Sequence, residues 1–208
     1  MKSVLISIQP KWCELIASGK KTVEVRKTKP KIDVPFKCYI YCTSSNVHEC
    51  LMQNESGVNL IHCINYKTAI PCGGEIANGK VIGEFVCDSI YHYRYTKPFF
   101  YHGIKMYHTN EHCTKACLTW EELENYLGDK DGYGWHISDL VIYDKPKELG
   151  EFEPLLCDYN FDTECGYKGK CKHQETTMCW GYITKRCNKQ ITRPPQSWCY
   201  VEVTDNET

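Results

Sequence analysis

The sequence has no long uncharged apolar run. No stretch approaches the roughly 18 consecutive apolar residues that mark a membrane-spanning helix. The segment that precedes Gln9 and Pro10 is too short to contain the apolar region of a secretory signal, which needs about 7 to 15 residues. We therefore expect a cytoplasmic protein that does not bind a membrane.

The chain also lacks internal repeats, low-complexity tracts and a strong excess of charge of either sign. Of its 208 residues, 42% are apolar and 25% are charged, which is ordinary for a globular protein. Its length favours one domain with an elaboration over two full domains. The formal net charge of -1 conceals a basic N-terminal part, because residues 1–37 contain nine lysines and arginines but three acids. Such a surface can hold phosphates, although solubility explains many lysine-rich surfaces equally well.

Standard zinc-binding spacings are missing as well, although cysteine itself is abundant. The chain has 15 cysteines, and an odd number cannot all pair in disulfides. Without a secretory signal, this number favours reduced thiols or a metal site. Residues 150–195 hold a group of cysteines and one histidine without a CxxC pair. Because this segment has few apolar residues, a structural zinc ion would supply folding free energy that the segment otherwise lacks.

We predict that four of these cysteines bind zinc, with a fifth cysteine or the histidine as a substitute: Cys157, Cys165, Cys171 and Cys187, then Cys179 or His173. The alternative is that these thiols are free and buried, or form adventitious disulfides. Cys113 and Cys117, with His108 and His112 nearby, could make a second metal site. The simpler interpretation is that these four side chains are ordinary residues of a local helix and bind no metal.

Apolar patterning predicts an α+β fold built from short strands and few helices. Strands are expected where apolar residues alternate or run together: residues 4–8, 21–27, 36–42, 80–88, 135–143 and 197–203. One helix is expected from Pro10 to a C-terminal cap at Gly19, and another from a capping box at Thr119 to Gly128. Residues 43–79 have weak periodicity and indicate a long loop with fragments of strand. The many short strands suggest a partly closed barrel.

The stretch GKKTVEVR, which ends at Arg26, alternates like a half-buried strand. Val23 and Val25 would face a core. The polar residues would share the opposite face: Thr22, Glu24 and Arg26. Taken alone, Glu24 and Arg26 could simply form a surface ion pair worth about 0 to 1 kcal/mol.

Glu84 lies in the strongly apolar stretch KVIGEFVCD, so its carboxylate is expected to be at least partly buried. A buried carboxylate is costly unless a cation or a hydrogen bond compensates for the lost water. Lys21 and Arg26 are the candidate partners, provided that the two strands lie close together. Such a group would be either a structural ion pair or a pocket for a polar ligand.

A run rich in tyrosine follows, with Tyr91, Tyr93 and Tyr95 at alternate positions beside Arg94 and Lys97. Single-stranded RNA is commonly held by stacking its bases on aromatic rings next to cationic groups. The ordinary alternative, which strand statistics favour, is that these tyrosines pack a half-buried strand.

Residues 7–26, SIQPKWCELIASGKKTVEVR, resemble the first strand, helix and signature of the ASCH family. Four residues fill all the fixed positions of its motif GxKxxExR: Gly19, Lys21, Glu24 and Arg26. The lead-in resembles the family through Ser7, Gln9 and Trp12. The resemblance extends more loosely through KVIGEFVCD and YGWHISDLVIY to RPPQSWCYVEV. The layout is similar to that of ASCH proteins from phages and prophages of Gram-positive bacteria.

The resemblance implies a PUA-like fold, which is a small mixed β-barrel flanked by short helices, with a cleft that binds RNA or modified nucleosides. The cleft residues would then be Ser7, Gln9, Trp12, Lys21, Glu24, Arg26 and Glu84. Some small family members are amidohydrolases that act on N4-acetylcytidine with a lysine, a threonine and a glutamate, and ribonuclease activity is also known in the family. The lysine corresponds to Lys21 and the glutamate to Glu84, but Glu24 occupies the threonine position. Thr22 lies two residues earlier on the same strand face.

We therefore predict one PUA-like ASCH domain in three parts: a barrel over residues 1–149, a cysteine-rich and zinc-binding insertion over 150–195, and the last strand with a tail over 196–208. Its predicted partner is RNA or a nucleoside-like molecule. Because a glutamate replaces the threonine, binding is favoured over hydrolysis. The alternatives are an amidohydrolase or ribonuclease that uses Lys21 and Glu84, and a zinc-stabilised protein-interaction module.

Overall fold

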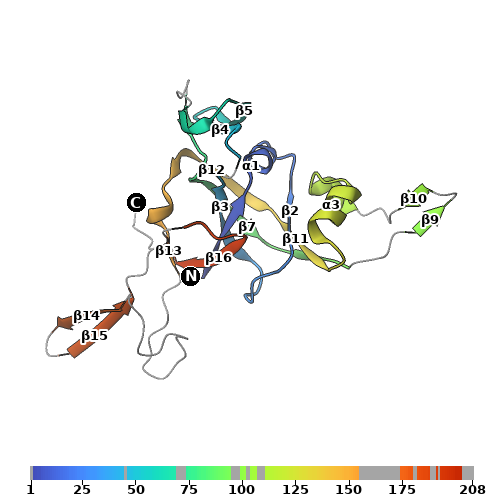
Figure 1. Ribbon diagram of the computed structural model, residues 1–208. Helices are drawn as coiled ribbons and strands as arrows, with labels where there is room; N and C mark the ends of the chain where they lie inside the picture. Colours follow the sequence, from blue (N-terminus) through green and yellow to red (C-terminus); the bar gives the residue numbers. More distant parts are fainter. Residues whose placement is uncertain are drawn as a thin grey trace.

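The protein is a mixed α+β structure in which short strands outnumber helices (Figure 1). The computed structural model describes residues 2–44, 46–68, 74–94, 99–101, 104–106, 111–154, 174–179, 182–187, 191 and 193–202. Within these ranges, none of the helices is long and apolar enough to cross a membrane.

The largest sheet has six strands in the order β12-β7-β3-β1-β16-β13. Their bounds are β1 Ser3–Ile8, β3 Phe36–Cys42, β7 Val81–Cys87, β12 Ser138–Lys147, β13 Glu153–Pro154 and β16 Trp198–Glu202. β1 runs parallel to β3 and antiparallel to β16, so the first and last of these strands in the chain are neighbours. Every residue of β1 is buried, as expected for a central strand covered on both faces.

A smaller sheet has the order β2-β11-β8, formed by β2 Val23–Arg26, β11 Gly132–His136 and β8 Ile90–Tyr93. Two short connections cross between the two sheets, one at Asp88 and Ser89 and one at Ile137. At the second crossing, the Ile137 amide donates to the Thr22 carbonyl at 2.9 Å. The predicted single strand over 135–143 is therefore wrong, because the backbone changes sheets inside it. Among the described strands, the sheets are open and do not form one closed barrel.

The main core fills the space between these two sheets and α1. Alternate residues of β1, such as Val4 and Ile6, pack there with Trp135 of β11 and Ile16 of α1. The other face of β1 carries Leu5, which belongs to a second apolar cluster on the far side of the large sheet. β1 thus joins both clusters, and its position fixes where the segments that follow it can lie.

The two longer helices begin and end as their sequences predict. α1 spans Pro10–Ala17, and Gly19 follows it with a φ of 72°, a backbone conformation that glycine adopts without strain. α3 spans Trp120–Leu127 and begins with both hydrogen bonds of a capping box between Thr119 and Glu122. The remaining helical segments are α2 Glu111–Lys115, η1 Tyr66–Thr68 and η2 Leu149–Glu151.

Residues 43–79 contain more structure than the predicted loop. A three-stranded sheet in the order β5-β4-β6 consists of β4 Glu49–Asn54, β5 Gly57–His62 and β6 Glu75–Ile76. The central residues of β4 are buried on both faces, so its sequence shows no alternation that would have revealed a strand.

Two further ribbons extend away from the sheets on opposite sides of the molecule (Figure 1). They are formed by β9 Phe99–Tyr101 with β10 Ile104–Met106, and by β14 Gln174–Cys179 with β15 Tyr182–Cys187.

We expect Gly134→Ala to destabilise the fold. A Cβ at this position would lie 2.6 Å from Tyr93 Cε2 and 2.9 Å from Val23 Cγ1, and both side chains are buried. Such overpacking costs about 1 to 3 kcal/mol, measurable by urea unfolding. Gly150→Ala is the matched control, because a Cβ there meets nothing within 4 Å. Equal effects of the two substitutions would contradict the packing described for β11.

Candidate functional site

A pocket of about 780 Å³ opens between the two sheets and α3. The ends of β1 and β3, the start of α1, β2, α3 and residues 194–197 before β16 line it. Its volume lies within the range of small-molecule and cofactor sites. Segments from both ends of the chain therefore build its walls.

Glu24 lines the pocket and lies between two cations. Its Oε2 is 3.4 Å from Lys21 Nζ, and its Oε1 is 3.0 Å from Arg26 Nη2. Only 8% of the Glu24 side chain is exposed, against 3% for Lys21 and 9% for Arg26. These three residues, which we call the charged triad, are therefore a buried network and not the surface ion pair that the sequence alone allowed.

Backbone carbonyls hold both cations of the triad in place. Lys21 Nζ donates to the Ala116 carbonyl at 2.7 Å, and Arg26 Nη2 donates to the Ser7 carbonyl at 2.6 Å. Ala116 follows α2 and Ser7 lies in β1, so the triad joins two distant segments to β2. These bonds compensate for part of the cost of removing the charges from water.

Strand register explains why the triad is buried. Glu24 lies opposite Trp135 of β11, so it shares the face of the small sheet that packs on the main core. Val23 and Val25 point the other way, into a cluster with Leu123 of α3, which confirms their predicted core positions. Both faces of β2 are thus covered, and the polar face becomes the inner wall of a pocket.

Six of the predicted binding residues line this pocket together: Ser7, Gln9, Trp12, Lys21, Glu24 and Arg26. Ser7 Oγ donates to the Pro195 carbonyl at 2.6 Å, which attaches the segment before β16 to β1. The Trp12 ring centroid lies 5.0 Å from Lys21 Nζ and 4.5 Å from Lys11 Nζ. Geometry brings these residues together, and their part in binding stays a prediction.

Several lining residues escaped the sequence analysis. β3 contributes Tyr41 and the segment after it, and α3 contributes Glu122, Asn125 and Tyr126. The three α3 positions follow the spacing i, i+3 and i+4, which places them on one face of a helix. That spacing was visible in the sequence, but nothing there indicated that this face borders the pocket.

Glu84 does not belong to the pocket, and its predicted pairing with Lys21 or Arg26 is wrong. Its Oε1 lies 2.7 Å from Lys37 Nζ, and Tyr143 Oη donates to its Oε2 at 2.7 Å. The physical reason is strand order, because β7 lies between β3 and β12 and does not pair with β2. Burial raises the pKa of Glu84, but the hydrogen bonds from Lys37 and Tyr143 outweigh this effect and hold the pKa below its ordinary value.

The residues predicted for hydrolysis are not assembled in one place. Of Lys21, Thr22 and Glu84, only the first lines the pocket. The backbone of Thr22 is bound on both sides, since its amide donates to the Lys115 carbonyl and its carbonyl accepts from Ile137.

The tyrosine run supports the packing interpretation where the structure describes it. Tyr93 is buried against Val23 and Val25, and Tyr91 packs on the same cluster. Tyr93 therefore cannot offer its ring to a base. Tyr95 and Lys97 lie outside the described residues, and Arg94 is exposed.

Most of the predicted zinc ligands lie outside the described residues: Cys157, Cys165, Cys171 and His173. Cys187 lies opposite Gln174 at one end of the β14–β15 ribbon, and Cys179 lies opposite Tyr182 at the other end. Five strand positions separate the two cysteines, which corresponds to about 17 Å at a rise of about 3.4 Å per residue. One zinc ion could therefore bind only one of them. The zinc site stays a prediction.

The other proposed metal group is not supported by the side chains that are described. No group of three or more His, Cys, Asp or Glu side chains is placed to hold a metal within the described part of the chain. Cys113 is buried in the cluster around Val23, and Cys117 Sγ donates to the Lys20 carbonyl at 3.3 Å. His108 and the side chain of His112 lie outside the described residues.

A comparison with protein-family models agrees with the sequence resemblance over part of the chain. The ASCH domain model matches residues 6–98, a segment that includes the end of β1, all of α1 and the charged triad. The crystal structure of ASCH from Zymomonas mobilis is similar at 16% identity over 96% of this chain and 87% of that chain, with a TM-score of 0.43. A serine-to-alanine mutant of that protein gives 16% identity over 96% and 88%, with a TM-score of 0.44. A search of curated proteins found no match.

We expect Glu84→Gln to lower stability only when Glu84 would be ionised. Because its folded pKa lies below the ordinary 4.5, the carboxylate contributes stability above that pH, and the contribution is lost as pH falls through the folded pKa. Urea unfolding should show a loss of about 1 kcal/mol at pH 7, since Lys37 is partly exposed. The loss should shrink below pH 4.5. Glu121→Gln, at an exposed position, is the control, and a loss at Glu84 that is independent of pH would contradict the pairing.

Zinc removal tests the cysteine-rich segment. Protein purified under reducing conditions should contain about one equivalent of zinc by elemental analysis, and a chelator should lower its thermal stability. Cys187→Ala should remove the metal, whereas Cys199→Ala, in β16, should retain it. A protein without zinc whose stability does not respond to chelator would exclude the site.

Proposed function

We propose that the protein binds RNA or a modified nucleoside, with the base in the pocket against the charged triad. The observation that carries this proposal is the buried Glu24 carboxylate held between Lys21 and Arg26 in the pocket lining. The ASCH match over residues 6–98 supports it, because the family resemblance implies such a ligand. The proposal includes a PUA-like fold for the matched segment and a relationship to phage and prophage members.

The pocket has the size and the walls that a nucleobase requires. Its volume of about 780 Å³ admits a ligand larger than a base alone. Trp12, Tyr41 and Tyr126 bring aromatic rings to its lining, and bases stack on such rings with little dependence on sequence. Ser7, Gln9 and Thr43 add hydrogen-bonding groups near the ends of β1 and β3.

The charged triad supplies a donor and acceptor pattern that suits the edge of a base. An ionised carboxylate only accepts hydrogen bonds, whereas lysine and arginine only donate them. The edge of a base presents amino or imino donors beside carbonyl acceptors, so it can satisfy both kinds of group at once. A ligand with such an edge would extend the network that these residues already form with one another.

The contacts of Lys21 favour recognition over hydrolysis. Its Nζ donates to the Ala116 carbonyl and pairs with Glu24, so it is engaged as a cationic donor. The nearest second carboxylate of the pocket lining, Glu122, accepts from the Thr119 amide at 2.8 Å as part of the α3 capping box. A threonine and a free acid beside Lys21, which the hydrolase alternative needs, are not among these contacts.

Two adjacent lysines provide a matched test. Lys21→Met removes one of the two buried cations of the triad, and Lys20→Met removes an exposed charge next to it in the chain. We expect Lys21→Met to weaken binding of ribonucleosides, N4-acetylcytidine and short RNAs by about tenfold or more, since a charged hydrogen bond is worth about 1.5 to 3 kcal/mol. Lys20→Met should change the affinity less than about twofold. Titration calorimetry measures both, and circular dichroism checks that each variant is folded.

Equal affinities in the two variants would show that the triad does not contact the ligand. Release of acetate from N4-acetylcytidine, or cleavage of the RNA, would instead establish the enzymatic alternative if Lys21→Met abolished it. Failure of wild-type protein to bind any of these ligands at low salt would remove the proposal.

A further inference from the structure

A pair of lysines lies on tyrosine rings beside the pocket. Lys27 Nζ is 5.3 Å from the centroid of the Tyr126 ring, and Lys29 Nζ is 5.7 Å from the centroid of the Tyr133 ring. Both lysines are exposed and follow β2 directly. Tyr126 itself lines the pocket, so this surface begins at the pocket wall. We call these four residues the rim.

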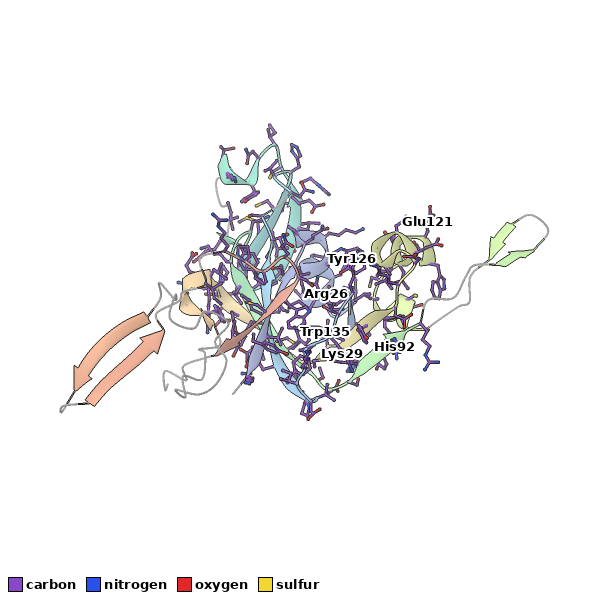
Figure 2. All side chains as sticks on the ribbon, turned by 60° about the horizontal axis from the view of Figure 1, so that its bottom comes forward. Arg26, Lys29, His92, Glu121, Tyr126 and Trp135 are labelled. Atoms are coloured by element: carbon purple, nitrogen blue, oxygen red, sulfur yellow. The ribbon has the colours of Figure 1, made fainter. Side chains whose placement is uncertain are left out.

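The aromatic surface continues from the rim across the small sheet. Tyr133 lies opposite Arg26 on one side and His92 on the other. The rings of His92 and Tyr133 are stacked, with centroids 5.3 Å apart and planes at 12°. Figure 2 labels Tyr126, Arg26, Lys29 and His92 in this part of the molecule. A path of rings and cations thus leads from the pocket towards β8.

The charges along this path favour an anionic chain. Lys27 and Lys29 are the cations of the rim, and Arg26 lies where the path meets the pocket. The acids along this path each have a partner, and the first of them, Glu24, is paired with Arg26. Asp131 Oδ2 lies 2.9 Å from His92 Nε2, and the Glu122 carboxylate binds the backbone of Thr119.

We infer that the ligand is a nucleotide within a single-stranded RNA, and that the rim holds the chain next to the base in the pocket. This inference rests on the proposed function. Lys27 and Lys29 would contact successive phosphates, and the rings beneath them would stack the neighbouring bases. Strand-binding proteins combine cationic grooves and aromatic rings in this way. A free nucleoside offers the rim nothing to bind, since it has neither phosphates nor neighbouring bases.

Salt dependence and a double substitution test the rim. Lys27→Gln/Lys29→Gln removes both cations, and Lys2→Gln/Lys20→Gln removes the same charge from two exposed positions outside the rim. The RNA probe is a 12-nucleotide single strand of mixed sequence. The nucleoside probes are the free ribonucleosides and N4-acetylcytidine. Each phosphate contact contributes about 0.7 to the slope of log affinity against log salt for a single strand. The rim variant should therefore lose about 1.4 from this slope, and about tenfold or more in RNA affinity at low salt.

The nucleoside affinity of the rim variant should stay within about twofold of the wild type, and the control variant should keep the wild-type slope for RNA. An unchanged slope and RNA affinity in the rim variant, together with nucleoside binding that depends on Lys21, would overturn the inference and leave the proposed function intact. Equal losses in the rim and control variants would also overturn it, because net charge alone would then explain the effect. RNA binding that depends on the rim but not on Lys21 would refute the pocket assignment instead.

Discussion

The buried carboxylate of Glu24 is the constraint on which the site depends. A charge with 8% of its side chain exposed persists in a protein only when cations and hydrogen bonds replace the lost water. Lys21 and Arg26 meet that need, and each is fixed in turn by a backbone carbonyl from another segment. One acid thereby positions the turn after α1, the residues after α2 and the end of β1 around a common point.

This arrangement also accounts for the polarity of the pocket. The triad has two cations and one anion, and Glu122 of α3 adds a second carboxylate, so the formal charges of the lining cancel and it presents both donors and acceptors. A ligand must therefore satisfy acceptor and donor groups that lie a few ångströms apart. Rigid neighbours such as Trp135, which is fully buried opposite Glu24, hold these paired groups in a fixed position.

Much of the fold follows from local sequence rules, and the exceptions have identifiable causes. α3 was predictable because Thr119 and Glu122 satisfy the capping box by themselves. The break at Ile137 was not, because an apolar run looks the same whether a strand continues or crosses to another sheet. β4 was missed since burial of both faces removes the alternation on which strand prediction depends.

For the site, as for the fold, the sequence predicted what depends on neighbouring residues in the chain, but not which strands lie side by side. The strand pattern and the family motif placed Glu24 and Arg26 together, because both lie on one face of one strand. Glu84 was assigned wrongly because period-two patterning gives the face of a residue but not the neighbour of its strand. Lys37 was the available partner, as it lies on adjacent β3, diagonally across from Glu84 and within reach of a long side chain.

The contact between Ser7 and Pro195 has a consequence for the order in which the pocket can arise during synthesis. These residues are 188 positions apart, and the wall they form also needs β16 paired with β1. The residues of the triad leave the ribosome early. Because synthesis adds about 5 to 20 residues per second, many seconds pass before residues 194–197 emerge. Throughout that interval β1 lacks one of its two strand neighbours, so the nascent chain holds the charged triad without the last wall of the pocket. Closure of the pocket therefore has to wait until the last strand has docked.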